Sequence, residues 1–439
     1  MYLLSNLKLS KSTFFSLLLA LMPFSFIAGN MIININLIFI IFSAIILFNK
    51  SLFKIKLFFL DKLILLYFFL IILTGTINDY YFFVQEMSWK GYFSTILKSI
   101  LFLKYLFLYI ILRYLIEEKF VNLKFFFISC LLATVFVSID IFYQLLNGKD
   151  IFGYEIIGSG RKLSGPFGDE LIAGGFIQRF FLFSFFILPV FYPNLSKKYS
   201  KFLIPILFLI FFIGIILSGN RMPLLLFLSS VILIIIFQKE TRKYFFSFIA
   251  IFFVIFFIIY NVNEKVKDNF LNFAYQIIYL GSAALGSDIY NSRAPYIKEF
   301  ASFYDTWLIN KYIGGGIKNF RYYCHARPNI DKNSKFVCNM HPHNYYLEIL
   351  TETGIIGFLV IVIIFLNILY ISFYKKYFSS TQMKNQITII PLIFLFIIEI
   401  FPIKSTGSFF TTGNATYLFL LIGILVGLIR RHNLIENQK

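Results

Sequence analysis

Two of the four histidines in this chain, His341 and His343, stand where a long polar segment runs into an apolar stretch. The sequence from His341 to Gly354 reads His-Pro-His-Asn-Tyr-Tyr-Leu-Glu-Ile-Leu-Thr-Glu-Thr-Gly. Because the unperturbed pKa of imidazole lies near neutral pH, His343 could accept a proton from a hydroxyl group as a general base. The alternative role is a histidine that only caps or fills a helix start. Asn344 and Glu348 would share one face of a helix and could orient a ligand or each other.

Two arginines stand at the edges of apolar or helical segments. Arg221 follows Ser-Gly-Asn between two apolar runs, where it could bind an anionic group of a substrate or anchor the chain to lipid headgroups. Arg293 precedes Ala-Pro at the start of a predicted helix, so its guanidinium and the helix amides could hold a phosphate together. The alternative for Arg293 is a surface ion pair with Glu299 or Asp288.

A further polar cluster runs from Arg161 to Glu170 and reads Arg-Lys-Leu-Ser-Gly-Pro-Phe-Gly-Asp-Glu. It could form a wall of an acceptor site, or it could be a loop whose glycines and proline make ordinary turns. Farther along, Gly314-Gly-Gly316 interrupts a helical pattern and predicts a flexible turn. Close helix packing explains Gly354 better than a chemical role does.

Two cysteines, Cys324 and Cys338, fall in the same long polar segment. An oxidising exterior would join them in a disulfide bond. The alternatives are free thiols and a structural zinc site that also uses His325, His341 and His343. The Cys-His adjacency and the His-x-His pair do not follow the usual spacing of zinc ligands, which favours the disulfide.

The composition places these residues in a membrane protein. The chain has 439 residues, 59% of them hydrophobic and only 14% charged, which lies outside the range of soluble globular proteins. Apolar runs long enough to cross a bilayer as helices recur along the whole chain. We predict an all-α polytopic bundle of about twelve spans, near residues 13–29, 31–49, 59–77, 96–116, 122–146, 171–193, 202–218, 222–238, 244–260, 349–373, 387–402 and 414–430.

The net charge of +19 would suggest a nucleic-acid partner in a soluble protein. Here lysines and arginines gather in alternate connections between spans, which is the orientation signal of membrane insertion. This pattern predicts no nucleic-acid partner, both termini in the cytoplasm and one large outward-facing helical loop at 261–346. Nine spans in residues 1–260 would precede the loop, and three spans with a short tail in residues 347–439 would follow it. The loop carries ten lysines and arginines, so its surface suits an anionic partner.

The outward-facing segments contain no Asp-x-Asp pair, so a metal-bound pyrophosphate is not favoured there. Arginines would then have to neutralise a leaving pyrophosphate, and Arg221 and Arg293 are available for this role. We therefore expect neither a metal nor a cofactor at the site.

Together these motifs resemble the O-antigen ligase and polymerase superfamily of bacterial envelope proteins. The resemblance covers residues from about Arg161 to Gly357. It is carried by Ser-Gly-Asn-Arg221, by Ser-Arg293 with Gly314 and Gly316, by His343-Asn344-Tyr-Tyr-Leu, and by Gly-Pro-Phe-Gly-Asp-Glu170.

The resemblance implies transfer of a glycan from an undecaprenyl-pyrophosphate carrier to a hydroxyl acceptor such as lipid A core. The reaction would be inverting and would take place at the periplasmic face of the bacterial inner membrane. On this basis Arg221 and Arg293 would bind the pyrophosphate, His343 would be the base, and His341 would support it. The compact loop and the order of the arginines and the histidine favour a ligase over a polymerase. A lipid-linked glycan flippase or exporter is the alternative from another class, but the predicted spans carry few charges to line a pathway.

Overall fold

The computed structural model describes residues 10–84, 94–157, 162–238, 242, 245–284, 295–326, 338–378, 387–404 and 407–436. Within these residues the regular structure is helical, and no strand longer than an isolated bridge occurs. The α-helices are α1 (Lys11–Ala20), α2 (Met22–Ala28), α3 (Asn30–Phe53), α4 (Phe59–Val84), α5 (Ser94–Glu117), α6 (Leu123–Asn147), α7 (Ala173–Phe191), α8 (Pro193–Leu217), α9 (Arg221–Phe237), α10 (Phe245–Val262), α11 (Glu264–Ala284), α12 (Pro295–Ile309), α13 (Phe320–Ala326), α14 (Tyr345–Leu369), α15 (Ile390–Glu399) and α16 (Thr412–Glu436).

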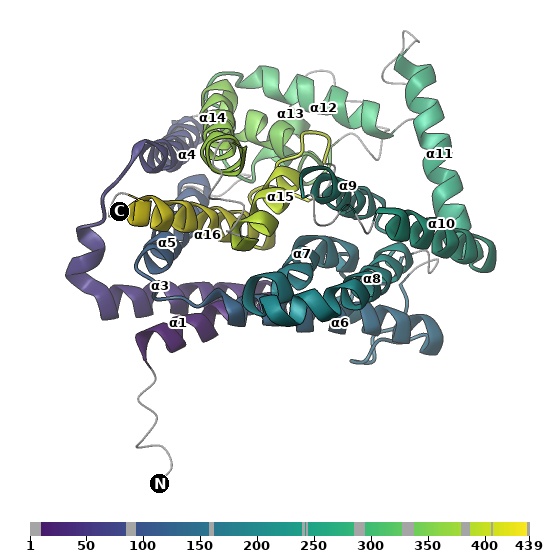
Figure 1. Cartoon of the computed structure of the whole chain (residues 1–439). Coiled ribbons are helices and arrows are strands. Elements are labelled where there is room, and N and C mark those ends of the chain that lie inside the picture. The colour runs from purple at the N-terminus through teal and green to yellow at the C-terminus, as the bar shows by residue number, and fades with distance from the viewer. Residues whose placement is uncertain are drawn as a thin grey trace.

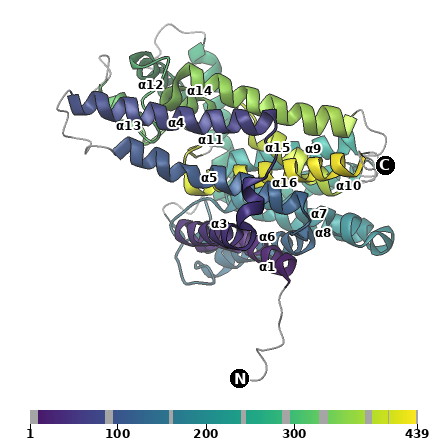
Figure 2. The same cartoon turned by 90° about the vertical axis from the view of Figure 1, so that its left-hand side faces the viewer.

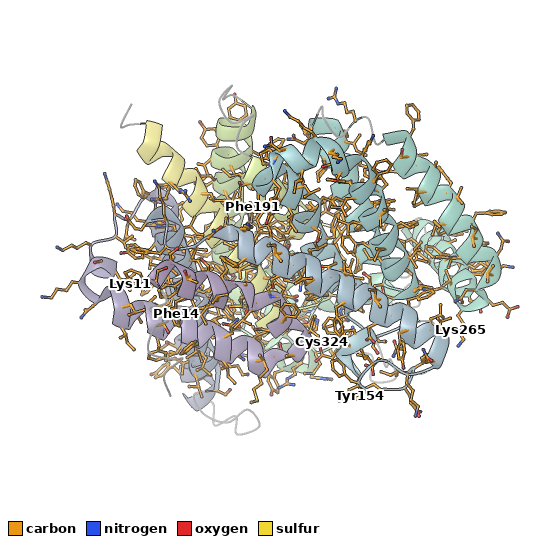
Figure 3. The ribbon with its side chains drawn as sticks, turned by 60° about the horizontal axis from the view of Figure 1, so that its bottom comes forward. Lys11, Phe14, Tyr154, Phe191, Lys265 and Cys324 are labelled. Atoms are coloured by element: carbon orange, nitrogen blue, oxygen red, sulfur yellow. A yellow bond between two sulfur atoms is a disulfide. The ribbon has the colours of Figure 1, made fainter. Side chains whose placement is uncertain are left out.

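Nine helical segments in the described part of the chain are long and apolar enough to cross a membrane, or ten if the bent pair Phe246–Val262 and Glu264–Tyr275 forms one span. The predicted all-α polytopic membrane fold is therefore confirmed. The predicted count of about twelve spans is not confirmed. Two apolar helices, Arg221–Phe237 and Ile387–Glu399, are shorter than a typical membrane crossing, and the bent pair turns by 107°. In Figure 3 carbon dominates the side chains that project from the bundle, as expected for a surface that contacts lipid.

The bundle centres on α5 and α16, which contact each other along their lengths (Figure 1). Two glycines of α16 permit this close approach. A Cβ added at Gly423 would lie 3.1 Å from Leu112 Cβ, and one at Gly427 would lie 3.0 Å from the carbonyl oxygen of Arg113. Small residues at such positions let transmembrane helix backbones come together, and this pairing holds α16 in the interior.

One end of the bundle contains a buried, charge-balanced network. Arg113 forms ion pairs with Asp61 and, at 3.3 Å, with Glu117. Arg430 reaches Asp61 at 3.1 Å and Glu117 at 3.8 Å. Two guanidinium groups thus meet two carboxylates from α4, α5 and α16, which satisfies charges that would otherwise be costly in this setting.

The helices of the long polar segment cover the opposite end. Figure 2 shows α4 and α14 lengthwise and side by side, with α12 and α13 gathered near one end of them. At this end, Asn78 on α4 donates a hydrogen bond to the carbonyl oxygen of Gly314 at 3.0 Å, and Asn319 donates to Thr95 Oγ1 on α5 at 2.9 Å. We call this the loop end of the bundle, and His343, just before the start of α14, lies here.

Candidate functional site

Asn344 sets the start of α14. Its side-chain oxygen accepts hydrogen bonds from the backbone N–H groups of Tyr346 and Leu347, at 2.9 and 3.2 Å, as an N-cap does. Its amide nitrogen donates to the carbonyl oxygen of Pro402 at 2.6 Å. Both ends of the side chain are thus engaged in holding α14 to the connection between α15 and α16. The cap fixes the position of His343, the preceding residue.

Glu348, one turn into α14, faces the same connection. Its buried carboxylate accepts hydrogen bonds from Ser408 Oγ and from the Phe409 N–H, each at 2.5 Å. Together with Asn344, this residue ties the helix start to Pro402, Ser408 and Phe409. The side chains of Asn344 and Glu348 therefore both bind other groups of the protein. These contacts fix the position of the start of α14.

His343 is 44% exposed, and its Nε2 lies 3.9 Å from Glu299 Oε1 on α12. Asn339 also donates a hydrogen bond to Glu299 Oε1, at 2.9 Å. Burial raises the pKa of Glu299, while His343 and the Asn339 hydrogen bond act in the opposite direction. An exposed imidazole beside an oriented carboxylate has the arrangement of a general base and its positioning group.

The role of Glu299 beside His343 was missed from the sequence, which suggested this residue only as a partner for Arg293. The two residues are 44 positions apart, and no periodic pattern links a residue of α12 to the residue before an N-cap. The one available signal was that both lie in the same polar segment.

His341 lies against His343, with ring centroids 5.0 Å apart. Its Nε2 is buried and makes no hydrogen bond with the described residues. Burial, with a smaller effect from His343, lowers the pKa of His341 to about 4. The ring is therefore neutral at neutral pH, and it packs against His343.

This pKa predicts a loss of stability in mild acid. Between pH 6.5 and about 4 the unfolded chain binds a proton at His341 that the folded chain does not, so stability falls as the pH falls through this window. His341→Asn should make the midpoint of thermal unfolding in detergent less dependent on pH between 7 and 5. The matched control is His325→Asn, at an exposed position. Equal pH slopes for the wild type and His341→Asn would contradict the prediction.

The predicted glycine turn docks on a break in α14. Gly314 and Gly316 have φ values of +83° and +81°, and Gly354 interrupts the helix with a φ of +65°. The N–H groups of Gly315 and Gly316 donate to the carbonyl oxygens of Thr351 and Glu352, at 2.9 and 2.8 Å. The turn thus forms a backbone joint between the polar segment and the bundle.

The Glu352 carboxylate completes this joint. It accepts hydrogen bonds from the N–H groups of Lys318 and Asn319, at 2.7 and 3.1 Å, just before α13 begins. A carboxylate at this place satisfies amides that a helix start leaves without partners. The orientation of α13, and of the residues it carries, therefore depends on α14.

Replacing Gly354 by valine should open this joint. A Cβ at Gly354 would lie 2.1 Å from the carbonyl oxygen of Tyr312, and the backbone conformation there disfavours any side chain. We expect a loss of about 1–3 kcal/mol from the backbone conformation alone, with the clash in addition. Thermal unfolding of the purified protein measures the change. Gly175→Ala on α7, where an added Cβ would meet only Pro223 at 4.0 Å, is the control and should unfold like the wild type.

A buried ionic cluster lies close to the start of α14. Arg179 on α7 pairs with Glu399 Oε1 at 3.3 Å, and Lys404 Nζ lies 2.6 Å from the same oxygen. Tyr345 and Asn414 complete the cluster, with the Tyr345 hydroxyl 2.9 Å from Glu399 Oε1 and Asn414 accepting from Arg179 at 2.5 Å. Burial lowers the pKa of Lys404 to about 8, and Glu399 opposes this shift. The cluster joins four helices next to His343.

Arg221 begins α9 and packs against α11. Its Nε and Nη2 donate to Asn269 Oδ1, at 2.9 and 2.7 Å, and its guanidinium carbon lies 5.3 Å from the centre of the Phe273 ring. Asn269 in turn donates to the carbonyl oxygen of Gly219 at 3.0 Å. A neutral amide therefore orients this cation at the helix start.

The contacts of Asn220 place Arg221 at the loop end. Asn220 Oδ1 accepts from the Gly174 N–H at 3.1 Å, at the start of α7. Arg179 of the ionic cluster lies five residues, or about 7.5 Å, farther along α7. Arg221 and His343 therefore share one end of the bundle, although among the described residues no direct contact joins them.

The structure describes only some of the other residues that the sequence predicted for the site. Arg161 and Arg293 lie outside the residues that the structure describes. Glu170 is exposed just before α7, and its N–H donates to the carbonyl oxygen of Phe167 at 3.1 Å, which is ordinary turn geometry. Cys324 and Cys338 form a disulfide bond with a Cα–Cα distance of 5.6 Å, so these sulfur atoms are not available as zinc ligands.

Comparison with known proteins identifies a family resemblance in the segment that contains Arg221 and His343. A search of curated proteins finds no match. A family model described as O-antigen ligase matches residues 206–362, from within α8 to within α14. The matched segment contains Arg221, the glycine turn, Glu299 and His343. Over this segment the chain is similar to the O-antigen ligase family, which supports the resemblance drawn from the sequence motifs.

Proposed function

We propose that this protein transfers a glycan from undecaprenyl pyrophosphate to a hydroxyl group of lipid A core, at the periplasmic face of the bacterial inner membrane. The observation that carries the proposal is the exposed His343 beside Glu299, at the start of α14 and inside the family match. Ligase activity is the first candidate, and polymerase activity of the same superfamily is the second.

In the proposed reaction, His343 takes the proton of the acceptor hydroxyl. The acceptor oxygen attacks the anomeric carbon, the bond from that carbon to the carrier phosphate breaks, and undecaprenyl pyrophosphate leaves with the electron pair. The configuration at the anomeric carbon inverts. Arg221, oriented by Asn269, would stabilise the negative charge that gathers on the pyrophosphate, with Arg293 as a proposed second cation.

The pairing of buried charges favours transfer over transport. Arg179 and Lys404 both pair with Glu399 at the loop end, and Arg113 pairs with Asp61 and Glu117 at the opposite end. A flippase or exporter needs polar groups that line a pathway through the membrane. In the described helices these charged groups are instead engaged with each other.

The test compares cells that lack this protein with cells complemented by the wild type or by His343→Ala, using electrophoresis of lipopolysaccharide. Long carrier-linked polymer without attachment in the deletion strain identifies a ligase, whereas attachment of single repeats identifies a polymerase. Retention of the carrier-linked glycan on the cytoplasmic face would instead support a flippase. Lipopolysaccharide identical to that of the wild type in the deletion strain would exclude all three functions.

A further inference from the structure

A pocket of about 610 Å³ lies beside the disulfide bond in the segment that carries the proposed base. Its lining residues are Arg321, Tyr322, His325, Cys338, Asn339 and Met340. This volume is within the range of small-ligand sites. None of the roles proposed above for Arg221, Glu299 or His343 uses the pocket.

We propose that this pocket binds an acidic sugar of the acceptor glycan, one that carries a phosphate or a carboxylate. The inference rests on the proposed glycan transfer and adds to it the chemical class of the acceptor. Arg321 is the main anion-binding group, Lys98 adds positive charge, and Tyr322 supplies an aromatic face.

The charges around the pocket carry the first part of the argument. The Arg321 guanidinium stacks 4.7 Å from the centre of the Tyr322 ring, and Lys98 Nζ lies 5.9 Å from the same ring centre. Arg321 donates to the Tyr322 hydroxyl at 2.8 Å and to Met340 Sδ at 3.4 Å.

No acidic side chain is among the lining residues, and within the described part of the chain neither Arg321 nor Lys98 forms an ion pair with a carboxylate. Two cations held beside one ring therefore favour an anionic ligand.

A buried hydrogen-bond donor without a partner also favours an anionic ligand. Arg321 Nε is buried and has no hydrogen-bond partner among the described residues. A buried donor without a partner is costly, and the cost is greater for a charged group. Phosphate and carboxylate oxygens are the acceptors that match the donor geometry of a guanidinium group.

The position of the pocket assigns it to the acceptor rather than to the carrier. Asn339 lines the pocket and also donates a hydrogen bond to Glu299, which faces His343. The disulfide joins Cys338, in the pocket wall, to Cys324 on α13, the helix that carries Arg321. A glycan in the pocket would therefore lie next to the imidazole that takes the acceptor proton. Arg221, the proposed carrier-binding group, stands instead on α9 against α11.

The test measures direct binding to the purified full-length protein, which does not require transfer activity. The probes are three disaccharides of equal size, one with a phosphate, one with a uronate carboxylate and one neutral. We expect the wild type to bind at least one acidic probe more tightly than the neutral one. Which acidic probe binds more tightly distinguishes a phosphate from a carboxylate.

Arg321→Gln should weaken binding of the preferred acidic probe by about 10- to 100-fold and leave the neutral probe unchanged, since a charge-assisted contact is lost. Lys98→Gln should give a smaller loss and serves as the second variant if Arg321→Gln does not fold. Lys265→Gln, at an exposed position on α11, is the matched control and should bind like the wild type.

Two outcomes would overturn the inference. One is equal affinity of the wild type for all three disaccharides. The other is an unchanged preference for the acidic probe in both Arg321→Gln and Lys98→Gln. Because His343→Ala retains the pocket, it should bind the acidic probe like the wild type. If the wild-type protein bound the acidic sugar but had no transfer activity, the proposed function would be wrong and the proposed binding site would still hold.

Discussion

His343→Ala is expected to lower the rate of glycan transfer by about 10²- to 10⁴-fold, the range usually contributed by a general base. The physical reason is that no other described side chain near Glu299 can take the acceptor proton as readily. His341, its neighbour, is half-buried with a pKa of about 4 and has its imidazole Nε2 in the interior. The loss should fall on kcat more than on KM, because an imidazole that acts mainly in the transition state contributes little to ground-state binding.

The measurement is the rate of transfer by the purified protein from a carrier-linked glycan to lipid A core. His341→Ala is the matched control, since it removes an imidazole whose ring centre lies 5.0 Å away. We expect His341→Ala to cost much less than His343→Ala. Equal losses in the two variants would show that the pair acts through packing and not through the chemistry of His343.

Arg221→Ala is expected to lower kcat by about 10²- to 10³-fold, the typical effect of removing one group that stabilises developing charge. Arg221→Lys should recover only part of the rate. An ammonium group keeps the charge, but it lacks the planar donors through which Arg221 Nε and Nη2 both contact Asn269 Oδ1. The same transfer assay measures both variants.

The control for this prediction is Arg242→Ala. Arg242 follows the other end of α9, where its Nη2 donates to the carbonyl oxygen of Ile236 at 2.7 Å. Its removal should leave transfer close to the wild-type rate. If Arg221→Ala retained full activity while His343→Ala did not, the pyrophosphate would have to be neutralised by other cations, and the role assigned to Arg221 would be wrong.

Apolar runs in the sequence were sufficient to predict the helices of the bundle. A helix in lipid must satisfy its own backbone hydrogen bonds, so a run of apolar residues predicts the element without knowledge of its neighbours. The cap at Asn344 is equally local, because the side chain bonds to amides two and three residues farther on. The count of spans was less secure because the 107° bend between α10 and α11 depends on what the second helix packs against.

By itself, then, the sequence determined an all-α membrane protein and the motifs around Arg221 and His343. Only the tertiary structure decided the partners of these motifs. Glu299 reaches His343 from another helix, and Gly354 receives the glycine turn because both backbones are folded into conformations that permit close approach. Arg179 meets Glu399 across 220 residues. Such contacts depend on which helices lie side by side, and helix packing is not encoded in the spacing of residues along one segment.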